Sequence, residues 1–394
     1  MNFKSYIFER VRTESHIGKI PVDIAASVLI GALLALINLR YALILSPDSS
    51  TYIRWADLLI GHRFNLLAYY DDNQFVSSPV FYTLPVGIIA LLKVAIGVHW
   101  ERIFFAINIL ALIATIEIFR RSARLLGISA LAVAGTLPLF SFTDFILWPH
   151  YLLTDTIFAA LVMASVYATL LTICNKKGFL IPIVYCALLF LARPSSPPFV
   201  FAILLFLVVC RFYFFAIGTV RLLVFLFFML LATAFIYGYV FEILLSRPSG
   251  SEQLMFIGQM IRKGIVIHDR PDTFVAWNPT VFNIARIFLL RIVTYFSPYA
   301  STYSAGHIFA NCVVLLSVMA GLFAWIGSSA ECGENMRKGA HFVLITTLCV
   351  AMFHAATLID FDWRYRFPVI APMFIFVAAG IDYCIKYFRE FRIR

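Results

Sequence analysis

Long apolar runs separated by short polar turns dominate the chain. Windows of about 19 residues, the length used to find membrane helices, mark these runs: 22–45, 79–97, 103–119, 127–147, 154–174, 179–192, 198–217, 219–241, 283–296, 306–327, 340–358 and 367–388. A helix needs about 20 apolar residues to cross the hydrocarbon core of a bilayer. The pattern therefore predicts a bundle of membrane-spanning helices.

Two of the runs are poor candidates for full spans. The run 79–97 contains Pro79, Pro85 and Lys93, and the run 283–296 is short and interrupted by two arginines. We expect both to lie in, or dip into, one leaflet of the membrane. The predicted fold class is an all-α polytopic membrane protein with about ten transmembrane helices, and an even number of spans places both termini on one side.

The composition excludes a water-soluble globular protein. The chain is 62% hydrophobic and 13% charged, with a mean hydropathy of +0.91, whereas soluble domains are about 25% charged. The net charge of +10 sits in short turns, which is typical of membrane topology and not of a nucleic-acid-binding patch. We predict cytoplasmic termini in a bacterial inner or plasma membrane, and a single integral-membrane domain over 1–394 without a separate soluble domain. Its two outer loops, with interfacial helices, are 46–102 and 242–305.

No metal site or disulfide framework is expected. The cysteines fall in apolar runs or short turns, and no Cys/His cluster has the spacing of metal ligands. His268, His307 and His354 also lack such spacing, so we expect them to be packing or interfacial residues.

Two acidic residues stand at the predicted outer ends of spans, where charge is costly and hence a functional candidate. Asp48 follows Pro47 at the end of the first span. It either caps the next helix or serves as a carboxylate at the membrane surface that acts as a general base. Asp155 offers the same alternatives, a helix cap or the second member of an acid/base pair.

Two basic motifs lie at the same predicted face. Arg193 precedes a proline-rich break and either reaches lipid headgroups or binds a lipid-linked phosphate. The turn Asp360–Pro368 holds Arg364, Tyr365 and Arg366, and it is either an interfacial anchor or part of a site. Asp360 and Asp362 have the spacing of a metal-binding acid pair, but the arginines beside them favour ion pairing.

Together these motifs resemble the GT-C glycosyltransferases, in particular the branch with lipid A aminoarabinose transferase and the protein O-mannosyltransferases. Asp48 with Tyr52 is similar to the Asp-Glu-x-x-Tyr start of the family's first outer loop, with Ser49 in place of the Glu. Asp155 in Leu-Thr-Asp-Thr-Ile-Phe is similar to the family's later Asp motif.

The basic residues extend the resemblance. Arg364-Tyr365 is similar to the family's Arg-Tyr motif, and Arg193 lies where relatives hold a Lys or Arg near the donor phosphate. The resemblance covers about 1–220 and 340–388, and 240–305 has no counterpart.

The resemblance implies transfer of a monosaccharide from a polyprenyl-phosphate carrier to an extracytoplasmic acceptor, which is a glycolipid, a polysaccharide or a protein, with inversion. Asp48 would be the general base, and Asp155 would orient the acceptor or support a cation. The remaining assignments are Arg193, Arg364, Arg366 and Tyr365 for the donor phosphate, and Tyr52 and His150 for the acceptor or sugar. A monophosphate donor requires no cofactor, and nothing in the sequence supports a divalent cation.

Two other functions compete with this one. An O-antigen-type polymerase or ligase has a similar number of spans and basic outer loops, and it would depend on outer Arg and His more than on Asp48. A non-enzymatic lipid or sugar transporter would need polar residues near the bilayer midplane, and the span centres here are nearly free of them.

Overall fold

The computed structural model describes residues 16–17, 20–41, 43–72, 79–174, 178–209, 218–246, 280–299, 303–329, 332–357 and 363–393. A short antiparallel pair, β1 (His16–Ile17) and β2 (Ile20–Pro21), precedes the helices. The α-helices are α2 (Val22–Leu39), α3 (Pro47–Gly61), α4 (Leu66–Asp72), α5 (Thr83–Ile96), α6 (Trp100–Leu125), α7 (Ala130–Thr136), α8 (Asp155–Ile173), α9 (Leu180–Phe190), α10 (Pro197–Val209), α11 (Thr219–Ser246), α13 (Val281–Tyr295), α14 (Ala305–Ser328), α15 (Glu334–Thr357) and α16 (Trp363–Ile393). Short 3-10 helices are η1 (Pro79–Tyr82), η2 (Gly97–His99), η3 (Leu137–Phe142), η4 (Asp144–Ile146) and η5 (Trp148–His150).

Seven helical segments in the described part of the chain are long and apolar enough to cross a membrane, and they are α2, the run from η1 to α6, α8, α11, α14, α15 and α16. The pair formed by α7–η3 and η4–η5, bent by 64°, makes an eighth if it counts as one span. The prediction of an all-α polytopic membrane protein is therefore confirmed. The count of ten spans stays a prediction. One of the ten predicted spans corresponds to α9, which has only 11 residues and rises about 16 Å, roughly half of the hydrocarbon thickness.

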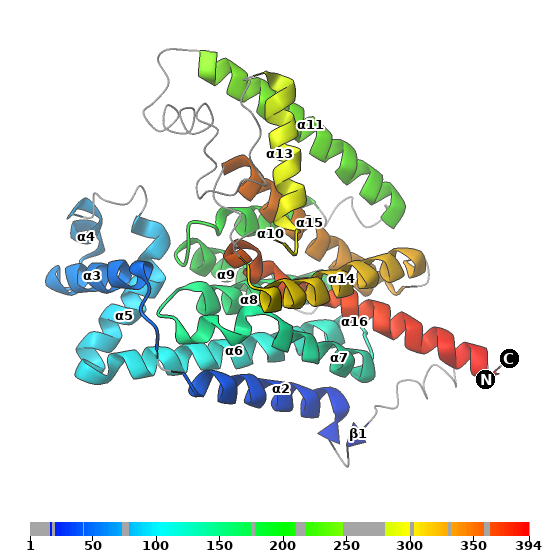
Figure 1. Cartoon of the computed structure of the whole chain (residues 1–394), viewed down its shortest axis with the longest axis horizontal. Helices are drawn as coiled ribbons and strands as arrows, with labels where there is room; N and C mark the ends of the chain where they lie inside the picture. The colour runs from blue at the N-terminus through cyan, green and yellow to red at the C-terminus, as the bar shows by residue number, and fades with distance from the viewer. Residues whose placement is uncertain are drawn as a thin grey trace.

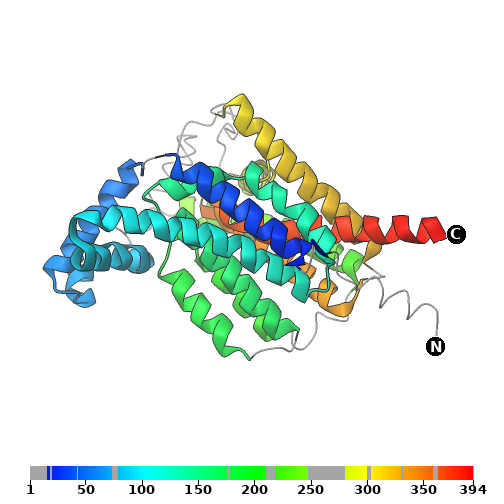
Figure 2. The same ribbon diagram turned by 90° about the horizontal axis from the view of Figure 1, so that it is seen from below.

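Helices α2, α6 and α16 run along the long axis of the molecule (Figures 1 and 2). Helices α3 and α4 lie at one end, which we call the α3 end, while β1 and the last turns of α16 lie at the other. Helices α2 and α6 pack side by side along this axis. The start of α2 and the end of α16 thus share one end of the bundle, as an even number of spans predicts. Which compartment each end faces stays a prediction.

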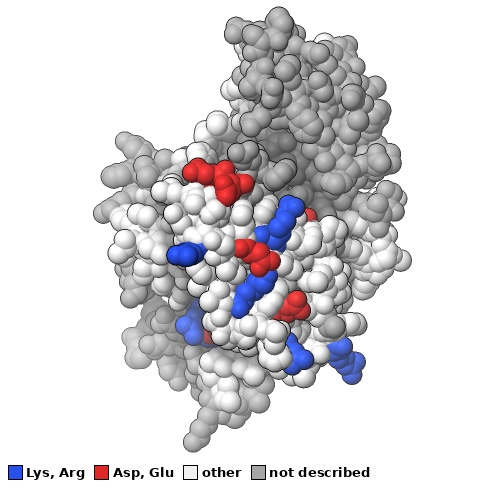
Figure 3. All heavy atoms as spheres, turned by 90° about the vertical axis from the view of Figure 1, so that its left-hand side faces the viewer, with Lys and Arg blue, Asp and Glu red and all other residues white. Residues whose placement is uncertain are grey.

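Charged side chains of both signs are scattered over the surface of the α3 end, among uncharged residues (Figure 3). Exposed residues here include Arg54, Asp57, Arg63, Asp71 and Asp72. Exposed charges are costly in the hydrocarbon core, so we expect α3 and α4 to lie at or outside the membrane surface. Helix α5 packs on α3, and the chain changes direction at Gly97, between α5 and α6. The packing on α3 agrees with the expected interfacial position for 79–97.

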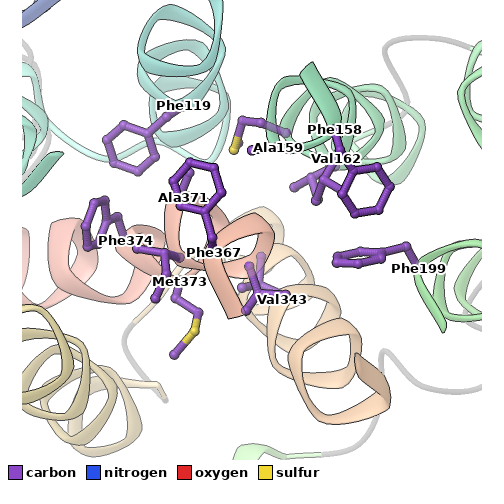
Figure 4. Packing of buried hydrophobic residues seen from close by; sticks show 14 of the residues in the cluster. Phe119, Phe158, Ala159, Val162, Phe199, Val343, Phe367, Ala371, Met373 and Phe374 are labelled. Carbon is purple, nitrogen blue, oxygen red and sulfur yellow. The ribbon is translucent and has the colours of Figure 1, made fainter. Parts of the chain in front are cut away.

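Helix α16 lies at the centre of the bundle. All of its residues from 366 to 380 are buried, and α6, α7, α8, α14 and α15 surround it. Figure 4 shows Phe374 of α16 beside Phe119 of α6, with their ring centroids 6.3 Å apart in an edge-on arrangement. A helix that is apolar on every side is expected to be buried, and here close packing holds the helices together.

The contact between α14 and α16 depends on two glycines. A Cβ atom on Gly321 would lie 2.5 Å from the backbone oxygen of Phe376, and one on Gly380 would lie 2.9 Å from the Cα of Gly321. We expect Gly321→Ala to lower the free energy of unfolding by about 1–3 kcal/mol, because a backbone atom cannot move aside as a side chain can. Thermal unfolding in detergent measures this effect. Gly327→Ala is the matched control on the same helix, where a Cβ meets nothing within 4 Å, and equal losses in the two variants would contradict the packing account.

The predicted orientation has a direct test in cysteine labelling. In a cysteine-free background, we expect Ser50→Cys on α3 to react with a membrane-impermeant thiol reagent in intact cells. Arg121→Cys, at the far end of α6, should react only after permeabilisation, because the basic turn 120–124 is predicted to be cytoplasmic. Both positions are exposed in the structure. The reverse pattern of labelling would invert the topology.

Candidate functional site

Backbone hydrogen bonds hold the start of α3 against the segment that precedes α8. The amide of Ile44 donates to the carbonyl of His150 at 2.7 Å, and the amide of Leu152 donates to the carbonyl of Ile44 at 3.1 Å. The hydroxyl of Ser49 donates to the carbonyl of Leu152 at 2.8 Å. The first two acidic motifs are therefore neighbours in space.

Ser46, and not Asp48, caps α3. The Ser46 hydroxyl accepts a hydrogen bond from the Ser49 amide at 3.2 Å, and the Ser49 hydroxyl accepts one from the Ser46 amide at 2.9 Å. This reciprocal capping box begins the helix, with Pro47 in its first turn. The cap alternative for Asp48 is wrong. Its half-buried carboxylate lies in the first turn, where the helix dipole favours negative charge.

Asp155 and Arg193 form a buried ion pair. Helix α8 begins at Asp155 and α9 ends a few residues before Arg193, so an antiparallel α8–α9 hairpin brings the two residues together. The Nη1 of Arg193 donates to the Oδ1 of Asp155, with the side chains only 7% and 2% exposed. The headgroup alternative for Arg193 is wrong, because its guanidinium is turned into the protein.

A cavity of about 260 Å³ opens where α3, the turn between α9 and α10, the end of α15 and the start of α16 meet. Its lining residues are Asp48, Thr51, Tyr52, Trp55, Tyr82, Arg193, Pro194, Ser195, His354 and Tyr365. Three of the four charged motifs contribute to this lining, and Asp155 of the fourth stands behind Arg193. The volume is close to the lower end of small-molecule sites, about 300 Å³, so it suits one small group.

Aromatic rings form two walls of the cavity. The rings of Tyr52, Trp55 and Tyr82 lie 5.2–5.9 Å apart, centroid to centroid. The Tyr365 ring, also in the lining, lies 5.7 Å from the guanidinium carbon of Arg193, within the range of a cation–π contact. Burial raises the pKa of the Tyr52 phenol well above its ordinary value, and the nearby Tyr82 raises it further. Tyr52 therefore keeps its proton at neutral pH and can donate a hydrogen bond.

Two of the predicted site residues lie outside this lining. The His150 ring is buried against Tyr41, at a centroid distance of 5.2 Å. The buried Arg366 donates from Nη1 to the carbonyl of Tyr295 at 3.4 Å and to that of Ser297, so it joins α16 to the end of α13. Their placement favours structural roles for both side chains.

Some predictions fall outside the described residues. Arg364 lies in the first turn of α16, but its side chain is not among those described. Asp360, Asp362, His268 and most of the loop 242–305 are also outside them.

His354 is the cavity residue that the sequence did not suggest. The prediction made it a packing or interfacial residue, whereas the structure places it in the lining with Arg193 and Tyr365. A usable signal existed, because His354 lies near the end of the run 340–358, ten residues before the Arg-Tyr motif that begins at Arg364. Tyr82 also belongs to the lining, and it comes from the run 79–97 that was expected to be interfacial.

Comparison of the chain with protein-family models, curated proteins and solved structures gave no significant match. Within the described part of the chain, no group of three or more His, Cys, Asp or Glu side chains is placed to share a metal ion. The residues that line the cavity are therefore the basis for assigning its chemistry.

Proposed function

We propose that this protein is a membrane glycosyltransferase that moves a monosaccharide from a polyprenyl-phosphate carrier to an extracytoplasmic acceptor, with inversion at the anomeric carbon. One observation carries the proposal. A single small cavity at the α3 end is lined by the carboxylate of Asp48, the guanidinium of Arg193 and several aromatic rings. This combination offers a proton acceptor, a phosphate ligand and an apolar surface in one place.

The proposed step is a direct displacement. An acceptor hydroxyl attacks the anomeric carbon and transfers its proton to Asp48, while the bond from that carbon to the carrier phosphate breaks. The phosphate leaves with the electron pair, and Arg193 stabilises its growing charge. No general acid is needed, because a phosphate monoester is a good leaving group.

Asp155 is a positioning residue in this mechanism. Its ion pair with Arg193 fixes the guanidinium at the cavity wall, and the Tyr365 ring supports the same group from another side. Arg presents its donors in a planar fork that matches phosphate oxygens. The pair thus supports the interpretation that Asp155 holds a cation, rather than the one in which it orients the acceptor.

The position and size of the cavity favour this function over its rivals. The α3 end carries the interfacial helices, so a carrier lipid can keep its tail in the bilayer while its phosphate reaches Arg193. A volume of about 260 Å³ suits one sugar residue better than the lipid-linked oligosaccharide of a polymerase.

Mass spectrometry of cell-envelope glycolipids, polysaccharides and glycoproteins tests the proposal. We expect loss of the gene to remove one sugar modification and to leave its polyprenyl-phosphate donor to accumulate. The wild-type gene should restore the modification. An unchanged set of envelope glycans in the deletion strain, with no accumulated donor, would contradict the proposal.

A further inference from the structure

His354 belongs to the cavity lining and has two buried ring nitrogens without a partner among the described residues. The residue as a whole is 1% exposed. Buried polar side chains nearly always have a partner in the protein or in bound water, so each exception needs an explanation. The position of His354 in the cavity lining points to a bound ligand as that partner.

Stacking fixes the direction of the imidazole ring. The ring of Tyr295 on α13 is stacked with it at a centroid distance of 5.8 Å and an angle of 15°. The Tyr365 ring of α16 lies 5.0 Å away, and Phe353 meets the imidazole edge-on at 5.6 Å. Because the two nitrogens lie in the ring plane, stacking of Tyr295 on the ring face does not use their hydrogen-bonding capacity.

We infer that His354 hydrogen-bonds a hydroxyl of the transferred sugar and so determines which sugar is accepted. A neutral imidazole has one donor and one acceptor nitrogen, whichever tautomer is present. A hydroxyl can both donate and accept, and can therefore pair with either nitrogen, whereas an ionised phosphate only accepts. The sugar hydroxyls thus match His354, and the carrier phosphate matches Arg193. The inference rests on the proposed function, because that function names the sugar.

Binding of carrier lipids with and without a sugar separates these two roles. The full-length protein in nanodiscs would be titrated with undecaprenyl phosphate and with undecaprenyl phosphate that carries glucose, mannose, galactose or arabinose. We expect the wild type to bind at least one sugar-bearing lipid about tenfold or more tightly than the bare carrier. His354→Phe keeps an aromatic ring for stacking but removes both nitrogens. It should lower the ratio of the affinity for the sugar-bearing lipid to that for the bare carrier to about one. The affinity for the bare carrier itself should stay unchanged, as expected for a lost pair of neutral hydrogen bonds to the sugar.

Two further variants make the result specific. His354→Gln keeps a donor and an acceptor, so it should retain part of the preference. His341→Phe is the matched control, because His341 is a buried histidine of the same helix that contacts Thr219 at 3.4 Å and lies outside the cavity lining. It should leave both affinities unchanged. If His354→Phe does not fold, as judged by thermal unfolding, His354→Leu serves with the same expected result.

The possible outcomes distinguish the inference from the function. A wild-type protein that binds none of these lipids would overturn the proposed function and the inference with it. Binding of the bare carrier with a sugar preference that survives in His354→Phe would overturn the inference alone, and so would equal affinities for bare and sugar-bearing lipids. In either of those cases the sugar is not the partner of His354.

Discussion

Asp48→Asn is expected to lower the rate of sugar transfer by about 10²–10⁴-fold, the usual contribution of a general base. Asparagine has the same size as aspartate but cannot accept the proton of the acceptor hydroxyl. Folding should be little affected, because Ser46 caps α3, and asparagine keeps the size and the polar character of the Asp48 side chain while the lost interaction with the helix dipole is worth about 0.3–1 kcal/mol. Single-turnover transfer from a polyprenyl-phosphate donor, at matched protein levels, measures the effect.

Asp57→Asn is the matched control for this experiment. Asp57 lies on the same helix, outside the cavity lining, and its carboxylate pairs with Lys93 at the surface. We expect this variant to turn over at the wild-type rate. Near-wild-type turnover by Asp48→Asn as well would mean that Asp48 does not accept the proton.

Arg193→Ala is expected to have two separate consequences. It removes the proposed phosphate ligand, and it leaves the carboxylate of Asp155 buried without its ion-pair partner. Breaking a buried pair from one side costs about 3–5 kcal/mol of stability, whereas removing both members is often nearly neutral. The double variant Arg193→Ala/Asp155→Ala should therefore recover most of the lost stability but still fail to bind undecaprenyl phosphate. Thermal unfolding and lipid titration, applied to the same three proteins, report the two effects.

Lys93→Ala provides the comparison with a surface ion pair. Its partner Asp57 is 55% exposed, so the loss of stability should stay below about 1 kcal/mol. Arg193→Lys keeps the charge but not the planar fork, and should bind the carrier with intermediate affinity. If the double variant regained lipid binding, Arg193 would not be the phosphate ligand.

The helices could be predicted from the sequence because apolar length and periodicity are local signals. The run 367–388 lies within α16, and the demoted run 79–97 contains the 14-residue helix α5 beside the surface helix α3. The break inside 127–147 was not predictable in this way. There, a side chain from a distant helix satisfies the irregular backbone, since the side-chain amide of Asn38 on α2 donates to the carbonyl of Phe145 at 3.1 Å.

For the candidate site, the sequence predicts that the residues lie at the same end of the bundle, but not which of them are in contact. Alternating spans place Asp48, Asp155 and Arg193 at one end of the bundle, and the structure brings all three together. The choice of partners depends on packing between helices that are far apart in the sequence. Nothing in the local pattern shows that Arg366 bonds to backbone carbonyls of α13, or that His354 and not His150 lines the cavity.

A structure of the protein with bound undecaprenyl phosphate, determined by electron cryo-microscopy in nanodiscs, would show whether Arg193 holds the carrier phosphate. We expect phosphate density in the cavity against the guanidinium of Arg193, near Tyr365, with the lipid tail leaving toward the bilayer. The carboxylate of Asp48 should face the space beside that phosphate where a sugar would be attached. Phosphate density at another place on the protein, with the cavity empty, would contradict the account.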